Sequence, residues 1–210
     1  LQGLNAVRGR MASADARDTG MLAFIPDGPN RGLRELSPGQ AFSTGPGQQA
    51  DLFVRDETGT ESRVRVGPSS RVEVLPNDGG LSLEQGKIRV TEDSSGVDPK
   101  TRKQRRSLLD TFLNCLKQAD YDFCYKSLRA AVQGKFSVRT PSAVLAEWGT
   151  DYVLSHDEST GQTTLAVLEG SVVFLDEAHG RAVLVEAGRA AATGREGAAL
   201  LPAPVDVEAE

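Results

Sequence analysis

Two patterns of hydrophobic and polar positions divide the chain of 210 residues. On both sides of a central block, short runs of β-branched or alternating apolar and polar residues are typical of half-buried strands. Turns rich in Gly, Pro, Asn and Asp separate these runs at the roughly 8–12-residue spacing of all-β domains. The expected strands are residues 51–54, 62–66, 71–75, 136–139, 144–146, 152–155, 164–168, 171–175 and 182–185.

The central block, residues 98–134, has a helical pattern instead. Asp98-Pro99 has the form of an N-cap followed by proline at the first helical position, and Gly134 is a typical C-terminal signal. Between them apolar residues recur at helical spacing: Leu108, Leu109, Phe112, Leu113 and Leu116, then more weakly Phe123, Leu128, Ala131 and Val132. This spacing predicts a helical hairpin with its turn at residues 119–122.

The chain therefore divides into three parts. Residues 1–97 and 135–195 form a discontinuous β domain, residues 98–134 are the inserted helical hairpin, and residues 196–210 are a flexible acidic, Pro/Ala-rich tail.

An internal repeat runs through the β domain. The spacing Leu81-x-Leu83-x-x-Gly86-x-Ile88-x-Val90 recurs as Leu165-x-Val167-x-x-Gly170-x-Val172-x-Phe174, again in residues 183–190, and in shortened form in residues 36–41. Apolar pairs at period two on both sides of a glycine corner indicate strand–turn–strand units, because glycine permits the positive φ of a corner. The fold class we expect is mainly β: a β-roll, solenoid-like or sandwich-like domain with an inserted α-helical hairpin.

Composition and charge narrow the function classes. The chain is 39% hydrophobic and carries 22 glycines, which is the ordinary globular range. No apolar run approaches the ~18 residues of a membrane span, and no signal peptide is present. Leu1 is not a natural translation start, so we expect the body of an exported protein from which a lipid anchor or span has been removed. The net charge of −5 has the wrong sign for a general nucleic-acid binder.

The helical block is charged differently from its host. Residues 100–129 contain eight Lys/Arg and three Asp/Glu, a net of +5, whereas the remainder has 16 and 26, a net of −10. Arg102, Lys103, Arg105 and Arg106 are our candidate partner-binding residues, steering an acidic protein partner. The alternative is a solvated helix end.

Candidate chemistry is sparse. His156, in Ser155-His156-Asp157-Glu158-Ser159, and His179, in Asp176-Glu177-Ala178-His179-Gly180, each carry residue types of a catalytic or metal site. Neighbours on one short segment do not normally assemble such a site, so we predict solvated turns at both. The glycines lack a phosphate-loop context. We expect no catalytic, cofactor-binding or metal-binding residue and no cofactor.

The two cysteines leave one alternative open. On a continuous helix, Cys115 and Cys124 lie on opposite faces, but a turn near Asp120 places them on facing helices, where a disulfide can close. Two reduced, half-buried thiols are the equal alternative.

Seven short segments then follow one another in a familiar order: residues 39–45, 66–72, 83–90, 136–141, 148–153, 168–172 and 185–189. The most specific are a V-x-T-P strand, a G-T-x-aromatic-x-V strand and an E-G-x-V hairpin. Over residues 30–92 and 135–192 the chain resembles the FecR-like domain, with the helical block as an insertion. The resemblance implies an all-β module of the bacterial cell envelope, usually periplasmic; its best-known members relay a signal from an outer-membrane receptor to a sigma factor.

From these observations we expect a non-enzymatic cell-envelope interaction or scaffold module, periplasmic or otherwise in the envelope, within a signalling or secretion assembly. One alternative is the periplasmic part of a FecR-type transmembrane sigma-factor regulator. A second is an extracytoplasmic glycan- or ligand-binding module that uses Trp148. A protein partner is expected in the first two cases, and the oligomeric state stays open.

Overall fold

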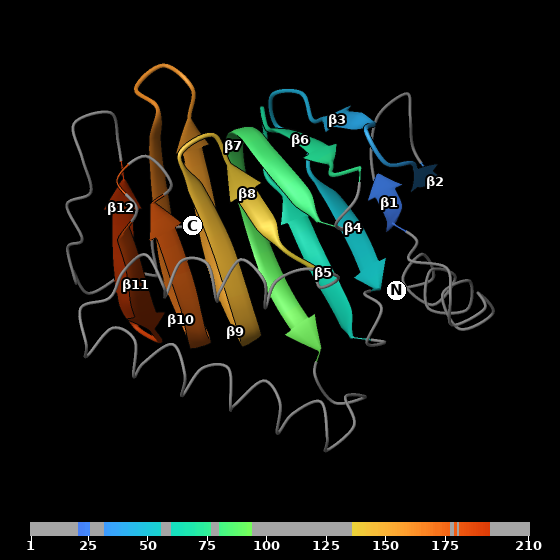
Figure 1. Cartoon of the computed structure of the whole chain (residues 1–210). Coiled ribbons are helices and arrows are strands. Elements are labelled where there is room, and N and C mark those ends of the chain that lie inside the picture. The colour runs from blue at the N-terminus through green and yellow to red at the C-terminus, as the bar shows by residue number, and fades with distance from the viewer. Residues whose placement is uncertain are drawn as a thin grey trace.

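The computed structural model describes residues 21–25, 32–55, 60–76, 80–93, 136–176, 179 and 181–193. This part of the chain is mainly β, built of strands and turns without a helix (Figure 1). The predicted helical hairpin of residues 98–134 and the tail of residues 196–210 lie outside the described residues.

The strands follow in chain order as β1 (Met21–Ile25), β2 (Gly32–Leu36), β3 (Ala41–Ser43), β4 (Ala50–Arg55), β5 (Glu61–Val66), β6 (Arg71–Val74), β7 (Leu81–Asp93), β8 (Val138–Thr140), β9 (Ala143–Asp157), β10 (Gln162–Asp176), β11 (Arg181–Glu186) and β12 (Arg189–Thr193). Except for the parallel pair β7–β8, neighbouring strands are antiparallel.

Three long strands, β7, β9 and β10, organise the fold, because each pairs with different neighbours in its two halves. The first half of β7 pairs with β6 and β8, and its second half pairs with β5 and β9. Likewise, the first half of β10 pairs with β12 and the second half with β11. Since β7, β8 and β9 also pair with one another in a closed circuit, the centre is a small barrel-like sheet with further strands on both sides.

Burial along these strands shows where they bend. In β7, Leu81 and Leu83 are buried, and so are Ile88 and Val90, so the buried set changes from odd to even positions across Gly86. Because side chains alternate between faces along a strand, one extra residue must be inserted at such a change, as in a β-bulge. The pairing of β6 with β7 shifts register at the same point. In β10 the even-numbered Val172 and Phe174 enter the core after Gly170, where the pairing with β9 is irregular, but Val173 and Leu175 are buried as well.

The two ends of β9 come close together. A straight strand of its 15 residues would span roughly 50 Å. Thr140 pairs with the first residue of β9, and Thr163 pairs with His156 near the other end of β9. Yet the hydroxyl oxygens of Thr140 and Thr163 are hydrogen-bonded, 2.8 Å apart. The sheet therefore folds over on itself. Its inner faces meet in one hydrophobic core, in which Tyr152, Phe174 and Leu145 are among the largest fully buried side chains.

A hydroxyl cluster fixes the bend of β7. The Ser70 hydroxyl accepts from the Lys87 amide at 2.9 Å and lies 3.2 Å from the Lys87 carbonyl oxygen. Thr44, the residue directly after β3, belongs to the same cluster. Its hydroxyl donates to the Gly67 carbonyl at 2.6 Å and accepts from the Ser70 amide at 3.0 Å. Gly86 has φ +93°, and a Cβ there would lie 2.3 Å from the Ser70 oxygen. Three separate motifs of the FecR resemblance thus meet at this bend.

The predicted strands are confirmed at β4, β5, β6, β8 and β11. The strand–turn–strand interpretation of the repeat is wrong at Gly86 and Gly170, where a single strand continues through the glycine. For the same reason, predicted strands 144–146 and 152–155 belong to the single strand β9, and 164–168 and 171–175 belong to β10. The interpretation is confirmed in residues 183–190, where β11 and β12 flank a turn at Gly188.

Candidate functional site

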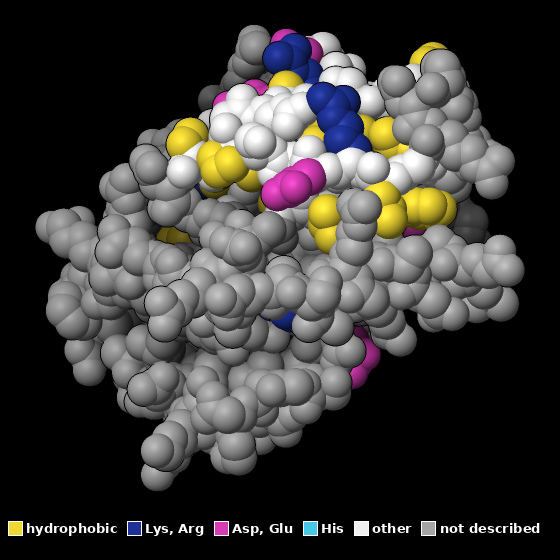
Figure 2. Space-filling model, turned by 90° about the vertical axis from the view of Figure 1, so that its right-hand side faces the viewer, with side chains coloured by type: hydrophobic (Ala, Val, Ile, Leu, Met, Phe, Trp, Pro, Cys, Tyr) yellow, Lys and Arg dark blue, Asp and Glu magenta, His cyan; other side chains and the backbone are white. Residues whose placement is uncertain are grey.

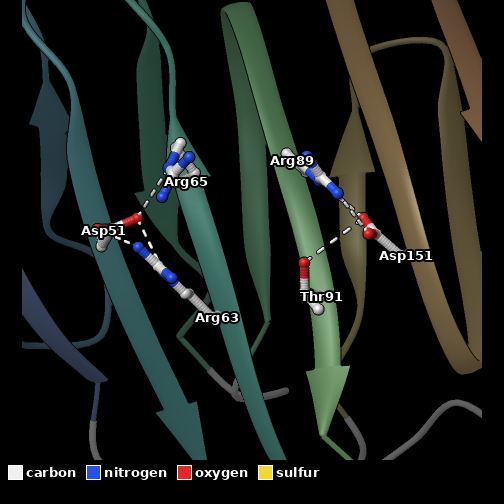
Figure 3. Close-up of polar contacts among 6 residues, drawn as sticks. All are labelled: Asp51, Arg63, Arg65, Arg89, Thr91 and Asp151. Atoms are coloured by element: carbon white, nitrogen blue, oxygen red, sulfur yellow. Dashed lines mark hydrogen bonds and ion pairs between the residues drawn. The ribbon is translucent and has the colours of Figure 1, made fainter. Parts of the chain in front are cut away.

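The outer face of the sheet carries a group of paired charges on β4, β5, β7 and β9 (Figure 3). Alternation turns these side chains away from the core, because their neighbours along each strand are buried. We call the group the outer arginine face; its members are Arg63, Arg65, Arg89, Asp51 and Asp151.

Asp51 on β4 holds two arginines of β5. Arg63 donates to its carboxylate through Nε at 3.1 Å and Nη2 at 2.7 Å, and Arg65 donates through Nε at 3.3 Å. The Arg63 guanidinium also lies 6.0 Å from the centre of the Phe53 ring. A bidentate pair fixes the plane of a guanidinium, so Arg63 is well oriented, whereas a single long bond leaves Arg65 less constrained.

Asp151 on β9 holds Arg89 of β7 in the same bidentate manner. The Nε and Nη2 atoms of Arg89 lie 2.9 Å and 2.6 Å from the two carboxylate oxygens, and the Thr91 hydroxyl lies 3.4 Å from one of them. The hydrogen bonds to Asp151 raise the pKa of Arg89 above its ordinary value. The guanidinium is therefore a permanently charged, oriented group.

Exposure separates the acids from the bases on this face. The side chains of Asp51 and Asp151 are 15% and 17% exposed, whereas those of Arg65 and Arg89 are 47% and 49% exposed. Solvent, or a ligand, therefore meets the guanidinium groups first. Three arginines against two aspartates leave a surplus of one positive charge.

The strand register places this charge at the middle of one cross-strand row. Arg65 on β5 lies directly opposite Arg89 on β7, although like charges directly opposite each other destabilise a sheet. The row continues to Asp51 and Phe24 on one side. On the other side it reaches half-buried apolar residues, Val153, Ala166 and Ala190.

Apolar side chains also reach the surface elsewhere. On the side of the molecule that carries β1 and β2, hydrophobic side chains lie beside Lys or Arg and Asp or Glu side chains (Figure 2). The half-buried hydrophobic residues of β1, Leu22 and Phe24, point away from the core side of that strand. A partner would meet charged and apolar groups together here.

His156 is not in a solvated turn, as the sequence predicted, but is 4% exposed in β9. It continues the inward-facing series of Tyr152 and Leu154. The sequence did contain a signal for this burial, because His156 stands at every second position after Tyr152 and Leu154. The polar residues next to His156 led to the prediction of a turn instead. Burial lowers the pKa of His156, while the negative charges of Glu84, Asp157 and Glu158 act in the opposite direction.

The hydroxyl of Thr163 bonds to the buried imidazole, and the hydroxyls of Thr140 and Ser142 bond to Thr163 in turn. Thr140 Oγ1 accepts from the amides of Ala143 at 3.0 Å and Ser142 at 3.3 Å, so its proton is left to point at Thr163. Thr163 Oγ1 lies 2.8 Å from Thr140 Oγ1, 2.8 Å from Ser142 Oγ and 2.9 Å from His156 Nδ1. The one proton and two lone pairs of the Thr163 hydroxyl account for all three of its bonds. The arrangement joins strands and leaves Thr163, which is fully buried, unavailable as a nucleophile.

The second histidine segment is partly as predicted. His179 lies in the turn between β10 and β11, but Asp176 is buried at the end of β10. Its carboxylate accepts from the His179 amide at 3.2 Å and lies 2.8 Å from the ring Nδ1. Asp176 therefore closes the turn from within.

The sequence-predicted partner-binding residues Arg102, Lys103, Arg105 and Arg106 lie outside the described residues, as do Cys115 and Cys124. The backbone of Trp148 is in β9, and its side chain is outside the described part. The charged face that the structure does describe was missed, because its members come from four strands whose register the sequence does not display.

Within the described ranges, no three His, Cys, Asp or Glu side chains are grouped so that they could hold a metal ion. The same ranges hold no apolar helix of membrane-spanning length.

Comparisons with known proteins give a distant likeness to solved structures. The chain matches no family model and no curated protein. In structure it is similar to a "putative anti-sigma factor" from Parabacteroides distasonis ATCC 8503, with 13% identity and a TM-score of 0.49 over 80% of this chain. A second crystal structure described in the same words gives 13% identity and a TM-score of 0.47. The chain spans 60% of the length of these solved chains.

Proposed function

We propose that this chain is a non-enzymatic, protein-binding module of a FecR-type transmembrane regulator and works on the extracytoplasmic side of the bacterial envelope. The observation that carries the proposal is the meeting of three FecR-like motifs at one bend. Thr44, Ser70 and Gly86 come from separate segments, and hydrogen bonds or close packing join them. The three motifs therefore occur together in the sequence because their residues build one bend. This supports the resemblance to the FecR-like domain, on which the proposed function rests.

Two features of the described part favour binding over catalysis. The Thr163 hydroxyl spends its hydrogen bonds on His156, Thr140 and Ser142, so this buried group serves to join strands. The outer arginine face, by contrast, exposes oriented charges on a rigid sheet, which is the geometry that steers and positions a protein partner.

The test uses the full-length gene product in its own bacterium. Residues 21–193 are deleted in frame, and transcription from the promoter of the associated sigma factor is followed with a reporter. We expect the truncated protein to remain in the membrane fraction while the reporter loses its response to the inducing signal.

The matched control is full-length protein carrying Ser69→Ala, an exposed position beside the buried Ser70. It should keep the reporter response. A reporter that responds normally after the deletion would contradict the regulator role and leave a scaffold role in its place.

A further inference from the structure

We infer that Arg65 and Arg89 form a docking site for a carboxylate side chain in an acidic, amphipathic segment of a protein partner. The inference rests on the proposed function in one respect, namely that the partner is a protein. It adds the surface, the residues and the chemistry that would recognise that partner.

The first argument is the placement of the two guanidinium groups. Directly opposite residues on antiparallel strands have Cβ atoms roughly 4.5–5.5 Å apart, so the two side chains start from adjacent points of the sheet. From there Arg65 turns toward Asp51 and Arg89 toward Asp151, which leaves a gap between the two guanidinium groups for a ligand (Figure 3). Their acidic partners, Asp51 and Asp151, stand on the flanking strands β4 and β9, not between them. The register therefore places two positively charged residues on adjacent strands, with no negative charge directly between them.

The second argument is the number of donors left over. A guanidinium has five N–H donors. Among the described residues, Arg65 is bonded through Nε alone and Arg89 through Nε and Nη2. Their remaining terminal N–H groups are directed to a side of the sheet where both residues are about half exposed. A carboxylate offers two oxygens, which matches such a pair of forks.

Charge decides between an acidic protein segment and a polyanion. The surplus on the outer arginine face is one positive charge, enough for one carboxylate. The whole chain carries −5, so its field repels nucleic acid and anionic membranes, whose binding grows with the number of phosphates neutralised. The two arginines attract a carboxylate locally, whereas the net negative charge of the chain repels a ligand with many negative groups. The site therefore favours a ligand with few of them.

The flanks of the row indicate what surrounds that carboxylate. Val153 and Ala166 continue the row beyond Arg89 and are half-buried. Phe24 ends it beyond Asp51. Apolar side chains of the partner on either side of its acid would cover these residues and shield the ion pair from water, which strengthens it. The partner segment is therefore amphipathic as well as acidic.

The experiment uses the purified full chain and a fluorescein-labelled peptide with a single Glu flanked by Leu residues, followed by fluorescence anisotropy. The double variant R65Q/R89Q is compared with R34Q/R71Q, which removes two exposed arginines outside the outer arginine face. We expect saturable binding that R65Q/R89Q weakens roughly tenfold, that R34Q/R71Q leaves unchanged, and that added salt reduces. Equal melting temperatures of the two variants establish that both are folded.

Several outcomes would overturn the inference. They are equal binding of a peptide with Gln in place of Glu, equal weakening by R34Q/R71Q, or no saturable binding at low salt. Tighter binding of single-stranded DNA or phosphatidylglycerol vesicles than of the acidic peptide would also overturn it. The assay involves no transcription, so its failure is distinguishable from a failure of the reporter experiment.

Discussion

The bends of β7 and β10 have the same sequence spacing but are held in different ways. Gly86 and Gly170 both have positive φ, +93° and +76°, and both are followed by apolar residues that return to the core. The bend of β7 is held by a side chain, the hydroxyl of Ser70, together with one backbone bond from the Gly67 amide to the Lys87 carbonyl at 2.8 Å. The bend of β10 is held by backbone alone: the amide of Ala187 donates to the Gly170 carbonyl at 3.1 Å, and that of Gly188 to the Val167 carbonyl at 2.8 Å.

This difference shows that a sequence repeat can specify where a strand bends without specifying which group forms hydrogen bonds to the bend. A bulge leaves backbone groups outside the strand ladder, and a buried group without a hydrogen bond costs about 1–3 kcal/mol. At β7 a serine from a distant turn supplies the bond. At β10 the following hairpin folds back and supplies it. The β7 bend should therefore be sensitive to side-chain changes to which the β10 bend is indifferent.

The largest effect is expected from Gly86→Ala. The new Cβ would lie 2.3 Å from the Ser70 oxygen and 2.6 Å from the Ser70 Cα, in a backbone conformation that disfavours side chains. Strain and overpacking together should lower the free energy of unfolding by roughly 2–5 kcal/mol. Urea denaturation followed by circular dichroism measures it.

Gly188→Ala, at the turn that holds the β10 bend, is the matched control. It also has positive φ, but a Cβ there has no atom within 4 Å, so backbone strain alone should cost about 1–2 kcal/mol. Equal losses for the two variants would show that the packing of Ser70 against Gly86 is unimportant.

Ser70→Ala should have the next largest effect. It removes the acceptor of the Lys87 amide while the backbone of the bend stays as it is. One buried amide without a partner predicts a loss of about 1–3 kcal/mol. Ser69→Ala, at the neighbouring exposed position, keeps a Cβ at the same positive φ of 52° and should change stability by less than about 0.5 kcal/mol. A neutral Ser70→Ala would mean that another group satisfies the amide.

Acid should weaken the region of the β7 bend, because His156 lies opposite Gly86 in the sheet. Its pKa is lowered in the folded chain, so as pH falls through the ordinary value of 6.5 the unfolded chain takes up the proton first. The stability held at neutral pH is then lost, by at most about 1.4 kcal/mol per pH unit. Melting temperatures between pH 7.5 and 5.5 measure the loss.

His156→Gln keeps a polar side chain at this position without the titration. The variant should melt with a smaller dependence on pH in that interval than the native chain. An unchanged pH dependence in His156→Gln would assign the effect to other groups.

The smallest effect is expected from Asp151→Asn, beside the β10 bend, where Asp151 pairs with Glu169. The variant loses the charge that holds Arg89 but leaves an amide in its place. Pairs with one exposed partner contribute roughly 0–1 kcal/mol, so stability should fall by less than 1 kcal/mol. High salt should reduce the difference between variant and native chain. A loss of several kcal/mol would show that the outer arginine face is structural.

The sequence by itself determined several of the strands and the bending points. Period-two alternation placed β4, β5 and β6 without any tertiary information, since a half-buried strand must alternate. The repeated glycine located both bends, because positive φ is a local requirement. The order of the seven FecR-like segments could likewise be recognised from the sequence alone.

Only the tertiary structure decided what each glycine became. The same spacing gives a bulge inside β7 and β10 but a hairpin turn at Gly188, since the available neighbours determine whether a strand continues or reverses. Tertiary pairing also buried His156 against Thr163 and brought Arg65 opposite Arg89. Register between strands distant in the chain depends on which faces pack together, and no local pattern records it.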